Sequence, residues 1–366
     1  MRSFLKPFSL IVLIMMLAGI LLAACSSGDN GANTSTNEAN SSEDETNSNE
    51  NEATAEDDAT ASDGETLTLS ASSGLPASNP ASQAMDLMAE KISEYTDGSV
   101  EVDVFYDNQL GDPTTLVSNV AQGTVDIVVT GNSYFTGLVP ELQVFELPFL
   151  FDSYEAARAA VDGPVGEKVM SMFEGTGLKP MYFWEIGFRH LANSVRPVQE
   201  PSDLEGIRLR TLPAPVQVKT WELLGAQPTP MDFSELYTSL QQGVVDGTEN
   251  PFSDITSAKL YEVLDYMSLT AHVYTPMTLA ISEQTWEKLD ESQQEAVMRA
   301  AEEAKEYQRN LNDEEEAKGL ETIKENGVTV EENPNVDAFA EIAVEAYDEF
   351  INEYGDELIE EIRAGQ

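Results

Sequence analysis

Short stretches with the apolar and polar alternation of strands are followed, repeatedly, by stretches with the spacing of helices. The alternation predicts strands at residues 66–71, 100–105, 125–129, 180–184, 207–211 and 244–246. The helical spacing predicts helices at 78–96, 113–122, 154–161, 165–173, 215–224, 232–242, 283–324 and 336–363, with Asp232 and Glu235 forming a capping box. Strands that alternate with helices predict α/β domains with largely parallel sheets. A length of 366 residues favours two domains.

The first 25 residues are typical of an export signal. Arg2 and Lys6 precede an uncharged apolar run at 8–24, and Cys25 follows small residues. This pattern resembles a bacterial lipobox, in which Cys25 is lipidated; a transmembrane anchor is the alternative, although the run is slightly short for one. Residues 26–64 contain acids but no Lys, Arg or aromatic residue, so we expect a disordered acidic tether.

Composition excludes several classes of function. The net charge is −47, whereas nucleic-acid binding requires a basic surface. One Cys and two His exclude a Cys/His zinc cluster, an iron–sulfur site and a structural disulfide, so we expect no metal and no cofactor. His190 lies beside Arg189, which is a poor setting for a general base. His272, between Thr270 and Tyr274, could contact a ligand or simply satisfy a backbone group. The segment 163–168 has the wrong glycine spacing for a phosphate loop, so catalysis has little support.

Basic residues are scarce in this chain, so their positions are informative. Arg189, Arg196, Arg208 and Arg210 fall within 22 residues. Arg210 lies near the carboxyl end of a predicted strand, where ligand crevices of open α/β sheets form. Its guanidinium could hold a carboxylate through two parallel hydrogen bonds; a surface arginine paired with an acid is the alternative. Asn250 could donate to a ligand oxygen or simply form a turn before Pro251.

The segment 201–251 resembles the substrate-binding proteins of TRAP transporters, the DctP-like family. It contains Pro-Ser-Asp-Leu-Glu-Gly before a basic strand, then Leu-Gly-Ala-Gln-Pro, then Glu-Leu-Tyr and Val-Asp-Gly-Thr-Glu-Asn. Further agreement lies at 108–111, 122–126, 140–142, 147–151 and 187–189, in the order that the family has them. The resemblance runs from about residue 66 to the C-terminus.

The resemblance implies an α/β, periplasmic-binding-protein-like (type II) fold, with a cleft between two domains and a long helix that spans both. The expected parts are a signal peptide at 1–25, a tether at 26–64, domain I at 65–187 plus 275–313, and domain II at 188–274 plus 314–366. By this resemblance Arg210 is the carboxylate clamp, Arg189 a second arginine of the site, Asn250 a ligand-binding amide and Phe233 a part of the pocket wall.

The resemblance also implies a function without catalysis. The chain would be an extracytoplasmic receptor, lipid-anchored at Cys25, that delivers a small organic acid to the small and large membrane subunits of a TRAP permease. A C4-dicarboxylate is the favoured ligand and needs a second charge partner, which Arg189, His272, Tyr274 or Lys219 could provide. If Arg189 instead braces Arg210, a monocarboxylate, a sugar acid or a zwitterion fits better. A ligand sensor for a membrane kinase and a secreted hydrolase are the alternatives.

Overall fold

The computed structural model describes residues 66–365, which lie within one compact unit, Ser62–Gln366. The predicted signal peptide, Cys25 and the tether lie outside the described residues. The strands are β1 Leu67–Ser72, β2 Val100–Phe105, β3 Ile127–Gly131, β4 Leu178–Asn193, β5 Arg208–Thr211, β6 Gln227–Pro230, β7 Gly247–Asn250, β8 Tyr266–Ser282 and β9 Thr329–Glu331. The α-helices are α1 Pro80–Tyr95, α2 Pro113–Ala121, α3 Tyr154–Asp162, α4 Pro164–Ser171, α5 Pro215–Leu223, α6 Phe233–Gln241, α7 Phe252–Ser257, α8 Glu283–Trp286, α9 Glu291–Glu325, α10 Val336–Ala343, α11 Tyr347–Tyr354 and α12 Glu357–Gly365.

All nine strands belong to one mixed sheet. Its order is β2-β1-β3-β8-β4-β7-β5-β6, and β9 pairs with β8. The pairs β1–β2, β1–β3, β5–β6, β5–β7 and β8–β9 are parallel, whereas β8 runs antiparallel to β3 and β4, and β4 runs antiparallel to β7. The expected α/β class is therefore confirmed, but the sheet is mixed rather than largely parallel.

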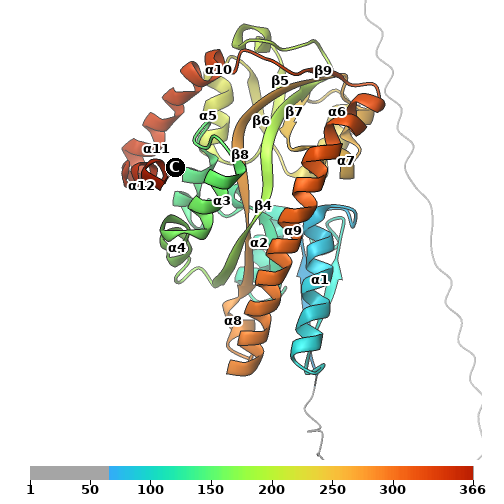
Figure 1. Ribbon diagram of the computed structural model, residues 1–366, viewed down its shortest axis with the longest axis vertical. Coiled ribbons are helices and arrows are strands. Elements are labelled where there is room, and N and C mark those ends of the chain that lie inside the picture. The colour runs from blue at the N-terminus through green and yellow to red at the C-terminus, as the bar shows by residue number, and fades with distance from the viewer. Residues whose placement is uncertain (1–65, 366) are drawn as a thin grey trace, which may run out of the picture. The chain divides into compact units, whose positions relative to one another are not determined.

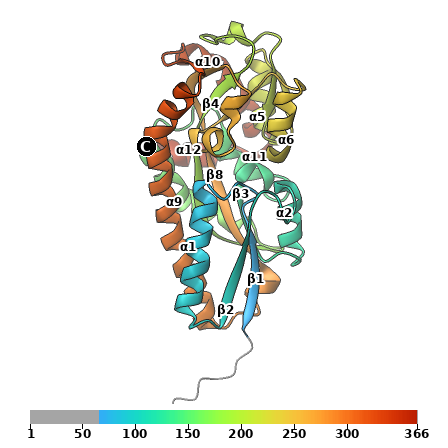
Figure 2. The same cartoon turned by 90° about the vertical axis from the view of Figure 1, so that its right-hand side faces the viewer.

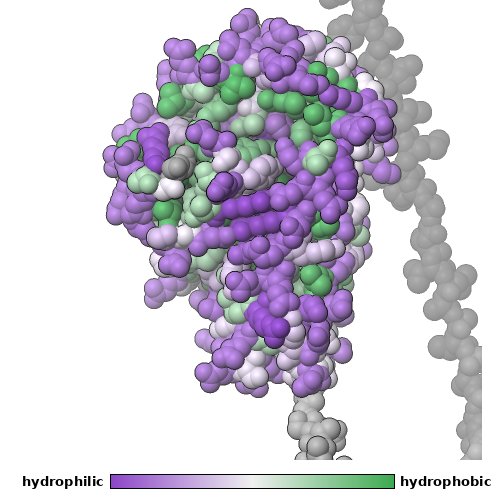
Figure 3. All heavy atoms as spheres, viewed as in Figure 1, coloured by the Kyte–Doolittle hydropathy of each residue, from purple (hydrophilic) through white to green (hydrophobic). Residues whose placement is uncertain are grey.

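Helices cover both faces of this sheet, so its central strands carry apolar residues on both sides. In β8, Leu279 and Ile281 join one buried cluster with α1 and α9, while the intervening Ala280 joins a second cluster on the opposite face. Successive side chains of a strand point to opposite faces, which explains this division. The part of the surface drawn in Figure 3 is mostly hydrophilic. No helix within residues 66–365 combines the length and apolarity that a membrane span requires.

Two long strands, β4 and β8, run through both halves of the sheet (Figures 1 and 2). Their pairing is interrupted by register shifts between Glu185 and Gly187 and between Arg189 and Leu191. The domain boundaries expected after residues 187 and 274 fall side by side here, because Gly187 pairs with Thr275. The 35-residue helix α9 contacts α1 in one half and α7 in the other. The division into two domains remains a prediction, and α12 packs on α3 and α4 rather than within the predicted domain II.

Most of the predicted elements are present with shifted bounds. The strand expected at 244–246 is wrong, since β7 begins at Gly247, and the strand expected at 180–184 is the middle of the much longer β4. No strand was predicted at β8. The helix expected at 283–324 is divided into α8 and α9, and the expected tail helix is divided into α10, α11 and α12. Asp232 does precede α6, but its carboxylate accepts from Thr114 Oγ1 at 3.0 Å and makes no capping bond.

Candidate functional site

A narrow, partly open cavity of about 20 Å³ lies where the two halves of the sheet meet. Its walls come from both halves: the loop after β1 and the end of β3 on one side, and β5, β7, α6 and α7 on the other. The residues that line it are Ser73, Gly74, Leu75, Pro113, Thr130, Gly131, Tyr134, Ile186, Arg189, Arg210, Leu212, Phe233, Asn250, Asp254 and Met277. Four predicted site residues, Arg210, Arg189, Asn250 and Phe233, are thus brought together.

Arg210 lies in β5 and its side chain is fully buried. Its Nε donates to the carbonyl oxygen of Met231 at 3.1 Å, and one terminal nitrogen donates to the Tyr134 hydroxyl at 3.3 Å. The guanidinium carbon lies 5.9 Å from the centre of the Phe233 ring. The other terminal nitrogen has no hydrogen-bond partner among the described residues, and within residues 66–365 Arg210 forms no salt bridge. A buried cation that lacks an anionic partner is costly, so this group is suited to receive an anion.

Arg189 lines the same cavity, but its charge is already neutralised within the protein. Its Nε donates to the Glu249 carboxylate at 2.5 Å, and one terminal nitrogen donates to the other carboxylate oxygen at 3.0 Å and to the Glu249 carbonyl at 2.5 Å. Both side chains are buried. Burial raises the pKa of Glu249, yet the Arg189 guanidinium and His272 outweigh it and lower that pKa to about 2. Glu249 is therefore a carboxylate near neutral pH, and Arg189 forms a structural ion pair.

Asn250 ends β7, where its side chain is almost completely buried. Its amide oxygen accepts from Thr248 Oγ1 at 2.7 Å, and its amide nitrogen donates to the Asp254 carboxylate at 3.1 Å. The other Asp254 oxygen accepts from the amide of Asn79, the N-cap residue of α1, at 3.2 Å. These contacts place a carboxylate beside the amide that the sequence analysis selected.

Two other predicted site residues lie outside the cavity. The ring of His272 is held between Thr270 and Glu249, with contacts of 2.8 and 3.2 Å, and packs against Trp221. The Tyr274 hydroxyl donates to Glu185 at 2.8 Å and its ring packs among other aromatic rings. Neither residue lines the cavity, nor does Lys219. We therefore do not propose them as ligand contacts.

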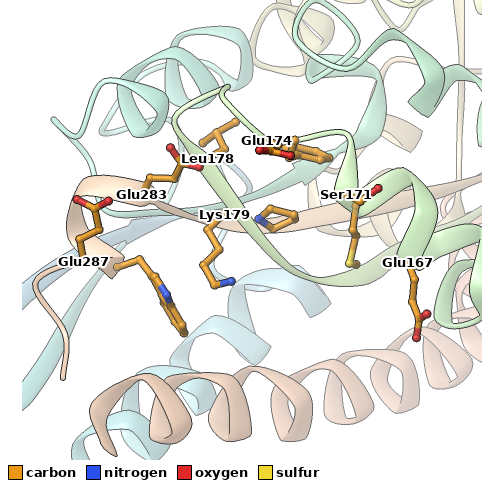
Figure 4. A pocket seen from close by; sticks show the side chains of 11 residues that line it. Glu167, Ser171, Glu174, Leu178, Lys179, Glu283 and Glu287 are labelled. Carbon is orange, nitrogen blue, oxygen red and sulfur yellow. The ribbon is translucent and has the colours of Figure 1, made fainter. Parts of the chain in front are cut away.

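A larger hollow lies between α4, the start of β4 and α8 (Figure 4). It has a volume of about 560 Å³, and its lining includes four glutamates and Lys179. The Lys179 ammonium lies 4.8 Å from the centre of the Trp286 ring. This hollow has a strongly negative lining, so it is unsuited to an organic anion. Among residues 66–365, no group of His, Cys, Asp or Glu is placed to hold a metal ion.

Two residues that line the cavity, Tyr134 and Asp254, and the Asp254 partner Asn79 are absent from the predicted site. Tyr134 lies in the Gly-rich turn after β3, and a tyrosine there carries no specific signal. Asp254 follows Asn250 by four residues, which places both at the cavity, but carboxylates are abundant in so acidic a chain. Asn79 was visible only as the start of a predicted helix.

The family model for bacterial extracellular solute-binding protein family 7, DctP, matches residues 71–353. The 2,3-diketo-L-gulonate-binding periplasmic protein YiaO of Escherichia coli K12 is 37% identical over 239 residues, which cover 65% of this chain and 73% of that protein.

Two solved structures of TRAP periplasmic solute-binding proteins are also similar. One, from Polaromonas sp. JS666 with bound D-erythronate, is 34% identical with a TM-score of 0.80, and the match covers 81% of this chain and 98% of that one. The other, from Sulfurospirillum deleyianum with bound succinate, is 30% identical with a TM-score of 0.78, and covers 82% and 99%. The chain therefore belongs to bacterial extracellular solute-binding protein family 7 and is a TRAP-type solute-binding receptor rather than an enzyme.

Proposed function

We propose that this receptor binds a small monocarboxylate that carries hydroxyl groups, such as a sugar acid, and holds its carboxylate on Arg210. The observation that carries the proposal is the unpaired, fully buried guanidinium in the cavity wall. A carboxylate placed there would complete the hydrogen bonds of that group in a site that excludes water. Each of the three similar receptors described above binds a small organic acid, and for two of them this acid is derived from a sugar.

The state of Arg189 favours a monocarboxylate over the C4-dicarboxylate that the sequence analysis preferred. A second ligand carboxylate needs a second cation, and among the lining residues Arg189 is the other one. Because Glu249 already neutralises Arg189, a second negative charge in the cavity would have no partner. Succinate binding by a relative means that the family's fold also accommodates dicarboxylates, so the preference rests on the Glu249 contact.

We also propose that the ligand is trapped by closure of the two halves of the unit. Two hydrogen bonds between the halves support this. Arg210 donates to the Tyr134 hydroxyl at 3.3 Å, and the Thr114 hydroxyl donates to Asp232 at 3.0 Å. Each joins a residue of predicted domain I to one of predicted domain II. Closure dries the site and strengthens the contact between arginine and carboxylate.

The test is calorimetric titration of the purified protein with D-erythronate, D-galactonate and D-glucuronate, compared with succinate and malate. Arg210→Gln should weaken binding by roughly 30-fold or more, since truncating one partner of a buried charge pair costs that much. Arg208→Gln is the matched control, because Arg208 lies on the same strand and pairs with Asp246 outside the cavity. Equal affinities of the Arg210→Gln variant and the wild type would overturn the clamp.

The proposed cellular role is delivery of the ligand to the membrane subunits of a TRAP permease, from a position anchored to lipid through Cys25. The support is the family membership together with the leader pattern and the single cysteine of the chain. Cys25→Ser should move the protein from the membrane fraction to the soluble fraction after export, and an unchanged distribution would contradict the anchor. The sensor alternative would be favoured if ligand uptake persists when the permease is deleted and a membrane kinase stops responding to the ligand when this receptor is deleted.

A further inference from the structure

The cavity contains a second charged side chain for which the proposed carboxylate clamp has no use. Asp254, in α7, is 4% exposed and lines the cavity together with Arg210. Within residues 66–365 it forms no salt bridge, so no cation contacts it directly. A buried carboxylate without a cation is unfavourable, which makes its position in a ligand cavity informative.

The hydrogen bonds of Asp254 leave acceptor capacity unused. One oxygen accepts from Asn79 at 3.2 Å and the other from Asn250 at 3.1 Å. An ionised carboxylate has about four acceptor positions, so two remain. The pKa of Asp254 is raised above its usual value, because burial outweighs the opposing effects of Arg189, the two amides and Arg210. The amides of Asn79 and Asn250 donate to the carboxylate. They orient it and leave its remaining acceptor positions open to a ligand.

The cavity therefore has two poles of opposite character. The unpaired terminal nitrogen of Arg210 is a donor with positive charge, and Asp254 is a carboxyl group with unused acceptor positions. A ligand that satisfies both needs one carboxylate and at least one hydrogen-bond donor. A dicarboxylate would satisfy Arg210 but bring its second charge toward Asp254 in a medium of low dielectric constant.

We propose that Asp254 is a specificity-determining residue, which accepts hydrogen bonds from ligand hydroxyl groups and repels a second ligand carboxylate. The proposal rests on the proposed function, because it takes the carboxylate at Arg210 as given. It assigns to one side chain the choice between hydroxylated monocarboxylates and dicarboxylates. A purely structural Asp254, one that only joins α7 to Asn79, would affect all ligands equally.

The experiment compares the affinities of the wild type and Asp254→Asn for D-erythronate and succinate by calorimetric titration of the purified protein. Asparagine has the shape of aspartate without its charge. We expect the ratio of the succinate to the erythronate affinity to rise at least roughly tenfold in Asp254→Asn. Asp265→Asn makes the same change at an exposed position and should leave the ratio unchanged. Asp254→Ser, measured in the same way, provides the comparison if the asparagine variant does not fold.

The outcomes separate this inference from the proposed function. An unchanged ratio in a variant that binds either acid overturns the role of Asp254 and leaves the Arg210 clamp intact. If the wild type binds none of the sugar acids and neither dicarboxylate, the proposed function fails and the inference fails with it. A zwitterionic acid that binds the wild type more tightly than every hydroxy acid would overturn the assignment of hydroxyl groups.

Discussion

Replacing Glu249 with glutamine should destabilise the protein strongly, because Glu249 neutralises a buried arginine. Both members of the Arg189–Glu249 pair are essentially inaccessible to solvent. Three short contacts join them, and His272 adds a fourth at 3.2 Å to the same carboxylate. Glutamine preserves the volume and one carbonyl oxygen, so the substitution removes mainly the charge.

The magnitude follows from the burial of the guanidinium that remains. Arg189 would keep its backbone contact with residue 249 but would lose its counter-ion in the protein interior. Removal of one member of a buried ion pair typically costs about 3–5 kcal/mol of unfolding free energy. We expect a loss of about 3 kcal/mol here, because the glutamine oxygen still accepts one hydrogen bond from Arg189.

Urea unfolding, followed by tryptophan fluorescence, measures this loss. Glu314→Gln is the matched control, since Glu314 pairs with Lys318 on the exposed side of α9 at 2.9 Å and should have no measurable effect. The Arg189→Gln/Glu249→Gln double variant completes a thermodynamic cycle. Its loss should be smaller than the sum of the two single losses, because neither charge is then left unpaired.

A loss of less than about 1 kcal/mol in Glu249→Gln would refute this reasoning, as would strict additivity in the cycle. The same variant has a second readout in ligand binding. With Glu249 neutral, Arg189 is free to receive a second carboxylate, so the affinity for succinate should rise relative to the wild type. An unchanged succinate affinity in a folded variant would contradict the view that Glu249 limits the cavity to one ligand carboxylate.

Two further predictions concern stability. Gly166→Ala should cost at least about 2 kcal/mol, because its Cβ would lie 1.8 Å from the Val161 carbonyl oxygen; Gly137→Ala, where nothing lies within 4 Å, is the control, and equal urea midpoints would contradict the clash. The folded-state pKa of Glu249 is lowered from 4.5 to about 2, so its stabilisation is complete above pH 4.5 and is lost as the pH falls toward 2. The stability difference between wild type and Glu249→Gln should therefore shrink between pH 5 and pH 3, and a constant difference would contradict this.

Local sequence patterns were sufficient to predict the helices and strands whose two faces differ in polarity. The helix expected at 78–96 is α1, with apolar residues on the face that packs against the sheet, and the strand expected at 207–211 is β5. Its position and the scarcity of bases made Arg210 a candidate, and the family resemblance selected it as the clamp. The surface-arginine alternative is wrong, since its side chain is fully buried.

The strand β8 was not recognised, although residues 267–273 alternate between apolar and polar side chains as a strand does. The alternation stops at Tyr274, and Pro276 argues against a central strand. Pro276 is tolerated because it pairs with Glu185 next to a register shift in β4. This register shift arises from the pairing of β4 with β8, so it cannot be read from the sequence of either strand alone.

The different roles of the two arginines of the cavity also depend on the pairing of distant strands. The family resemblance put Arg189 and Arg210 in one candidate site and left open whether Arg189 serves the ligand. The antiparallel pairing of β4 with β7 sets Leu191 opposite Glu249, and this brings a carboxylate that lies 60 residues away onto the Arg189 guanidinium. Local periodicity carries information about faces and ends of elements. The partner of a buried charge depends on the register between distant strands, so the free arginine became identifiable only in the folded chain.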